Sequence, residues 1–143
     1  MSRIENSFAD LIEVRMRLCL DSPFSTLMNL KNSSLFQCYK IFKNDYERPS
    51  GYITWANVNK ESFSRLSVCG GVPKYSYEWN EGNLVYLTEF LNSGRSNFSL
   101  RREFRLMFRK RRVVMFVRNG CVRIYVRKNS KFILQSRLDL EKC

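Results

Sequence analysis

The sequence predicts a single-domain α/β protein, in which helices flank a mixed sheet. Its 143 residues are the usual length of one domain, and 44% of them are hydrophobic, which is enough for a packed core. Segments with helical periodicity and short apolar or alternating segments typical of strands follow one another along the chain. No repeat, linker or change of composition divides them, so we expect one domain over residues 1–143.

The first half of the chain is expected to hold one helix and a hairpin. Residues 5–20 have the spacing of an amphipathic helix, whose apolar stripe contains Phe8, Leu11, Ile12, Leu18 and Cys19. This helix is expected to end before Pro23, because the residue that precedes a proline is pushed out of the helical conformation. Residues 35–43 and 51–58 have the pattern of strands, and the polar segment between them predicts a turn.

The second half is expected to contain a strand, a helix and a hairpin. Residues 84–91 (LVYLTEFL) form an apolar run that is too short for a usual helix, so we predict a buried strand. A basic helix is expected to begin with Ser99 as its cap. Asn119-Gly120 lies between two strand-like segments, 113–118 and 121–127, and this is the strongest short hairpin signal. The tail that follows is expected to be a short strand or a frayed end.

The amino-acid composition excludes some kinds of reactive site and favours some kinds of partner. The chain has no histidine, which excludes an imidazole acid, base or metal ligand. Its net charge of +12 favours an anionic partner, whether nucleic acid, anionic lipid or an acidic protein. No apolar run approaches the ~20 residues of a membrane span, and the N-terminus lacks a secretory pattern, so we expect a cytoplasmic protein. An odd number of scattered cysteines argues against a disulfide framework and against a zinc site: Cys19, Cys38, Cys69, Cys121 and Cys143.

Two stretches are more specific than the rest, in a chain without a phosphate-binding glycine loop or a nucleophile elbow. The first is residues 49–57 (PSGYITWAN), and the second is residues 78–82 (EWNEG), which lead into the apolar run that carries Glu89. Together they resemble the toxin-activating lysine acyltransferases, which fatty-acylate RTX haemolysins with acyl groups from acyl carrier protein. The resemblance implies a fold like that of the GCN5-related acetyltransferases.

The resemblance covers about residues 18–132 and implies a catalytic site that lacks its usual base. The catalytic aspartate of the family falls on Glu89. Its catalytic histidine, which follows a Ser-Pro near the end of the first helix, falls on Ser25. Serine cannot deprotonate an amine, so lysine acylation here would depend on the carboxylate alone. The resemblance also implies four substrate-binding candidates, among which the amide of Asn57 is suited to an oxyanion or a phosphopantetheine arm: Trp55, Asn57, Trp79 and Tyr86.

Residues 101–112 contain seven basic residues in twelve, more than a solvated helix face needs. We therefore predict a surface that binds an anion or a partner, formed by Arg101, Arg102, Arg105, Arg109 and Arg112. The resemblance to the acyltransferase family implies that this surface binds an acyl carrier protein or another partner protein. A phosphate track for nucleic acid is the weakest alternative, because the sequence has no reading helix or RNA-binding motif.

The missing histidine indicates a resemblance to one particular branch of this family. A branch of the family without it occurs in gene clusters for siderophore-peptide microcins, which are bacteriocins. There the family member and a partner protein join the C-terminal serine of the peptide to a glucosylated catecholate siderophore. The resemblance implies a maturation protein of this kind, working in a hetero-complex. No cofactor is evident, and the implied donors are a nucleotide with magnesium or an acyl carrier protein.

Two alternatives remain open. The first is a lysine acyltransferase that activates an RTX-type protoxin, with Glu89 as the lone base. The second is a non-catalytic binding subunit with a degenerate acyltransferase fold, whose partner carries the reactive residues.

Overall fold

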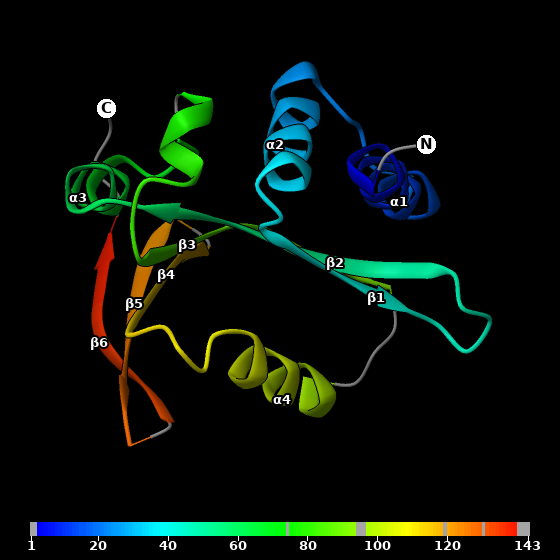
Figure 1. Cartoon of the computed structure of the whole chain (residues 1–143). Helices are drawn as coiled ribbons and strands as arrows, with labels where there is room; N and C mark the ends of the chain where they lie inside the picture. Colours follow the sequence, from blue (N-terminus) through cyan, green and yellow to red (C-terminus); the bar gives the residue numbers. More distant parts are fainter. Residues whose placement is uncertain (1–2, 74, 94–96, 119, 130, 140–143) are drawn as a thin grey trace. The chain divides into compact units, whose positions relative to one another are not determined.

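The computed structural model describes residues 3–73, 75–93, 97–118, 120–129 and 131–139 (Figure 1). Its elements confirm the mixed α/β class, and the strands are hydrogen-bonded in the order β1-β2-β3-β4-β5-β6. In chain order, the elements are α1 (Arg3–Arg17), α2 (Phe24–Leu35), β1 (Tyr39–Lys43), β2 (Pro49–Val58), α3 (Lys60–Cys69), η1 (Ser76–Trp79), β3 (Leu84–Asn92), α4 (Asn97–Met107), β4 (Val113–Arg118), β5 (Cys121–Lys128) and β6 (Lys131–Asp139).

The described residues fall into two compact units. Unit 1 contains the chain up to Trp55 and the segment from Thr88 to Ser93, and unit 2 contains Ala56–Leu87 and the residues from Asn97 onwards. Strands β2 and β3 each run through both units. The expectation of one domain over the whole chain stays a prediction.

Unit 1 combines helices α1 and α2 with the predicted hairpin, β1 and β2. The hairpin is confirmed, with an antiparallel register that pairs Tyr39 with Thr54. Its turn is closed by the Asn44 side chain, which accepts hydrogen bonds from the backbone N–H groups of Tyr46 and Arg48. The core of this unit joins both helices to β2, through Leu11, Val14, Leu30 and Tyr52.

Helix α2 is the main departure from the prediction in unit 1. The predicted strand over 35–43 begins only at Tyr39, because Leu35 is the last residue of α2. Pro23 stands at the N-cap in an extended conformation and the helix starts directly after it. Helix α1 has already ended at Arg17, and proline is well suited to the beginning of the helix that follows. The serines and asparagines of α2 interrupt its apolar stripe and concealed the helix, although it buries Leu30 and two serines.

Helix α3 in unit 2 is, after α2, the second helix that the sequence patterns did not predict. Helix α3 is capped by Asn59, whose side chain accepts a hydrogen bond of 2.9 Å from the backbone of Ser62. It ends at Gly70, which adopts φ 69°. Cys69, the last residue of the helix, is disulfide-bonded. Cys19, Cys38 and Cys121 are thiols.

The rest of unit 2 is a sheet with α4 beside it. Strand β3 runs parallel to β4, with Val85 opposite Val114, and β4, β5 and β6 are antiparallel. The predicted hairpin is confirmed, and the tail after it forms the strand β6. Helix α4 starts at Asn97, so Ser99 lies inside the helix rather than at its cap.

Aromatic contacts fix α4 against this sheet. The ring of Phe104 meets those of Phe108 and Phe132 edge-on, at centroid distances of 5.0 and 5.8 Å. Phe132 belongs to β6, so these contacts join the helix to the last strand. None of the described helices combines the length and the apolar character needed to span a bilayer.

Candidate functional site

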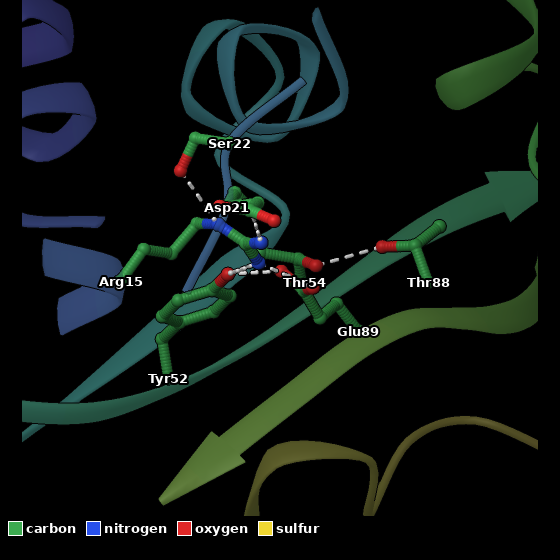
Figure 2. Close-up of polar contacts among 7 residues, drawn as sticks. All are labelled: Arg15, Asp21, Ser22, Tyr52, Thr54, Thr88 and Glu89. Atoms are coloured by element: carbon green, nitrogen blue, oxygen red, sulfur yellow. Dashed lines mark hydrogen bonds and ion pairs between the residues drawn. The ribbon is translucent and has the colours of Figure 1, made fainter. Parts of the chain in front are cut away.

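A polar cluster in unit 1 is centred on Arg15 of α1 (Figure 2). The guanidinium is almost fully buried, and its Nη1 lies 2.7 Å from Oε2 of Glu89. Its Nε donates to the Ser22 hydroxyl at 3.0 Å, and its Nη2 donates to the backbone carbonyl of Asp21. A buried cation is tolerated only where acceptors surround it. Arg15 has acceptors in three segments of the chain, which are the loop after α1, strand β2 and strand β3.

Glu89 of β3 supplies the carboxylate that pairs with this guanidinium. One oxygen of its carboxylate accepts from Arg15, and the other accepts from the Tyr52 hydroxyl of β2. Its side chain keeps 30% of its surface exposed, whereas that of Arg15 keeps 7%. Beside it, the hydroxyls of Thr54 and Thr88 are hydrogen-bonded at 2.7 Å, which ties β2 to β3 (Figure 2). The carboxylate is thus held from within the protein and open on the outside.

The protonation of the two buried donors follows from their surroundings. Burial lowers the pKa of Arg15, but hydrogen bonds and charge from Tyr52 and Glu89 outweigh it and raise the pKa overall. Burial, followed by the hydrogen bond to Glu89, raises the pKa of the Tyr52 phenol. At neutral pH the guanidinium is therefore charged and the phenol keeps its proton, so both act as donors to Glu89.

Ser25, the position that corresponds to the catalytic histidine in the resemblance, is exposed in the first turn of α2. The serine that reaches the cluster is Ser22, through Arg15. Trp55, the remaining candidate in unit 1, is half-buried in β2, where its backbone N–H donates to Cys38.

Sequence reasoning missed Arg15 and Tyr52. A signal for Arg15 was available, because it occupies the turn between Leu11 and Leu18 on the apolar stripe of α1. A charged residue at a core position of a helix requires a buried partner. Glu89, an acid in an apolar strand, requires one for the same reason, and the fold pairs them.

The other candidates belong to unit 2, where the two specific stretches of sequence meet through the backbone. The carbonyl of Asn57 accepts from the backbone N–H groups of Glu81 at 3.0 Å and Gly82 at 3.3 Å. A Cβ atom at Gly82 would lie 2.2 Å from the carbonyl oxygen of Val58, so only glycine allows this approach. Trp79 is fully buried. The Trp-x-x-Gly element thus has a packing role in this unit.

Two further side chains of unit 2 also serve the core. The Tyr86 hydroxyl donates to the Gly71 carbonyl at 2.5 Å, and burial raises the pKa of this phenol to about 12. Glu78 is buried and forms an ion pair of 3.0 Å with Arg65 of α3, which fixes η1 to that helix. None of these contacts leaves an acid open to solvent.

The predicted basic surface is exposed where it is described. In α4 and the turn after it, Arg102, Arg105, Arg109 and Arg112 are exposed, and the side chain of Arg101 lies outside the described ones. Unit 1 therefore holds Glu89, Ser25 and Trp55, and unit 2 holds Asn57, Trp79, Tyr86 and the arginines.

No family model matches the chain, and a search of curated proteins finds no significant match.

Proposed function

We propose that the chain is an acyltransferase-like maturation protein for a peptide toxin, working with a partner protein. The proposed reaction joins the C-terminal serine of a microcin to a glucosylated catecholate siderophore. The sequence resemblance suggests the family, and a fold like the GCN5-related acetyltransferases is part of the same proposal. Glu89 is the proposed general base.

The observation that carries this proposal is the ion pair between Glu89 and Arg15, 2.7 Å apart. A lysine substrate is an ammonium ion before it is deprotonated, and the neighbouring guanidinium repels it. A sugar hydroxyl is neutral and can donate a hydrogen bond to a lone pair that Arg15 and Tyr52 leave free on the carboxylate. The pair thus favours a hydroxyl acceptor over an amine, in agreement with the missing histidine.

In the proposed step, the hydroxyl oxygen attacks the activated carboxyl carbon of the peptide. An ester C–O bond forms, the activating group leaves with its bonding electrons, and Glu89 accepts the hydroxyl proton. Arg15 and Tyr52 act as positioning residues, since they hold the two carboxylate oxygens. Within the described ranges, no three Cys, Asp or Glu side chains are grouped to hold a metal ion. We therefore assign no residue to magnesium and derive no step through a nucleotide.

The test is a mass measurement on the peptide. The protein and its candidate partner are incubated with microcin peptide, glucosylated siderophore and nucleotide. We expect the peptide to gain the mass of the siderophore, less one water. A parallel reaction contains a protoxin and acyl carrier protein loaded with fatty acid. Acylation of a lysine there, without any gain on the microcin, would contradict the preference for a hydroxyl.

A second candidate function, a non-catalytic binding subunit, is favoured by one observation. Both oxygens of Glu89 already accept hydrogen bonds from Arg15 and Tyr52, as they would in a purely structural pair. A double variant, Ser25→Ala with Glu89→Ala, distinguishes the two candidates. Full activity of this variant in the complex would assign the chemistry to the partner and leave this chain a binding role.

A further inference from the structure

Strand β6 ends the hydrogen-bonded order of the sheet. Its inner edge pairs with β5 from Lys128↔Lys131 to Cys121↔Asp139. Within the described residues, no strand pairs with its outer edge. A strand in this position presents a row of backbone N–H and C=O groups, which can pair with another chain.

Two apolar side chains on β6 remain exposed. Ile133 and Leu134 keep 49% and 45% of their surfaces exposed. As consecutive residues of a strand they point to opposite faces of the sheet. Proteins usually protect an edge with proline, charges or a bulge. The register of β6 shifts between Leu134 and Ser136, but β6 contains neither proline nor a charge between Phe132 and Gln135. Both faces of this edge therefore offer apolar surface to an added strand.

The charge of the chain indicates what kind of strand can be added. Residues 95–143 contain 15 of the 25 basic residues and three of the 13 acidic ones, so this segment carries the whole net charge of +12. Residues 1–94 contain ten of each and are neutral overall. The β5–β6 hairpin already places Lys128 opposite Lys131, both exposed.

These charges decide between the possible occupants of the edge. A second copy of this chain, pairing β6 with β6, would bring two such basic segments together, which electrostatic repulsion disfavours. Nucleic acid or an anionic lipid headgroup would meet the positive charge through phosphate but would leave Ile133 and Leu134 unused. An extended segment of protein with acidic and apolar side chains satisfies the backbone edge, the apolar surface and the charge together.

We propose that β6 is a strand-addition site for an extended acidic segment of another protein. The added strand hydrogen-bonds to the outer edge of β6, its apolar side chains cover Ile133 and Leu134, and its carboxylates face the basic residues of the hairpin. This site belongs to unit 2 and involves no chemistry, so it is independent of the role of Glu89.

The first experiment measures binding of two designed probes to the full chain by fluorescence anisotropy. One is a nine-residue peptide with three consecutive valines in its middle, which present apolar side chains to both faces of the sheet, and glutamates toward both ends. The other has lysine in place of each glutamate. We expect the acidic peptide to bind at least about tenfold more tightly, and its affinity to fall as salt is added. Equal binding of both peptides, or none of either, would overturn the proposal.

The second experiment locates the site by hydrogen exchange. The acidic peptide should slow exchange at the amides of 131–135 and leave those of β1, the strand at the other end of the order, unchanged. Ile133→Asp together with Leu134→Asp should weaken binding about tenfold. Met16→Asp, at an exposed apolar position of unit 1, should change it less than about twofold. Protection confined to α4, or displacement of the peptide by equimolar single-stranded DNA, would assign the surface to nucleic acid instead.

Discussion

Among the described residues, each unit contains one ion pair that joins a buried to a more exposed residue, and the two pairs are arranged in opposite ways. In unit 1 the cation is buried and the acid is open: the side chains of Arg15 and Glu89 are 7% and 30% exposed. In unit 2 the acid is buried and the cation is open: Glu78 is 9% and Arg65 is 43% exposed. Of these two pairs, only the one in unit 1 leaves its carboxylate accessible to solvent.

This difference separates the proposed reactive site from a structural ion pair. Arg65 meets Glu78 alone among its described contacts, in a pair that joins α3 to η1. Arg15 meets Glu89, Tyr52, Ser22 and Asp21, and its hydrogen bonds reach three segments of unit 1. A carboxylate held by two buried donors is preorganised, as a general base must be. The buried carboxylate of unit 2 has no comparable access.

The largest effect on stability is expected from Arg15→Met. The substitution removes a buried charge with four partners, and we expect the free energy of unfolding to fall by about 3 kcal/mol. Arg65→Met should lower it by about half as much, because the buried Glu78 carboxylate that it leaves behind still accepts from the Tyr75 backbone N–H. Arg17→Met is the matched control on the same helix, since the exposed pair of Arg17 and Glu13 is worth less than about 0.5 kcal/mol. Urea denaturation measures all three, and equal losses for Arg15 and Arg65 would erase the contrast between the units.

A smaller loss is expected from Gly82→Ala in unit 2. The new methyl group would clash with the backbone of Val58, and we expect a loss of about 2 kcal/mol. Gly120→Ala is the comparison, because Gly120 has φ 72° and open space around it. It should lose only about 1 kcal/mol, from backbone strain. Thermal unfolding measures both, and a Gly82→Ala variant as stable as the wild type would remove the packing explanation of the Trp-x-x-Gly element.

The smallest effect is a dependence of stability on alkaline pH. The pKa of Tyr86 is raised to about 12 in the fold, above the value near 10 of an unfolded tyrosine. The protonated phenol therefore adds stability that is fully present below pH 10 and is lost as the pH rises toward 12. Tyr86→Phe should reduce this loss between pH 10 and 12, whereas Tyr46→Phe, at an exposed position, should not. Identical slopes in denaturation series for Tyr86→Phe and the wild type would contradict the assignment.

The sequence predicted the strands better than the helices. The β3 run and the Asn-Gly hairpin were found because apolar runs and turn residues act locally. Helices α2 and α3 were missed because their serines and asparagines weaken the apolar stripe that identifies a helix. Asn59 ahead of Lys60-Glu61 was a usable cap signal for α3.

The candidate site was predicted in part. Glu89 was a candidate because an acid is unusual in an apolar strand. Its partner Arg15 lies 74 positions away, and no local pattern connects the two residues. Ser25 was assigned by resemblance, and the structure joins Ser22 to the cluster instead. The Trp-x-x-Gly element was prominent in the sequence because its backbone contacts demand specific residues, and such demands arise from packing as readily as from chemistry.

The central claim is that Glu89, held by Arg15 and Tyr52, accepts the proton of the acceptor hydroxyl. The most direct test is the rate of siderophore attachment by Glu89→Gln, in the complex and with folding verified by circular dichroism. Glutamine keeps one acceptor oxygen for Arg15, and its NH2 group can donate to the Tyr52 hydroxyl in place of accepting from it, but the amide cannot take up a proton at neutral pH. We predict a fall of at least about 100-fold in this rate. A Glu89→Gln protein as fast as the wild type would contradict the claim and leave the cluster a structural role.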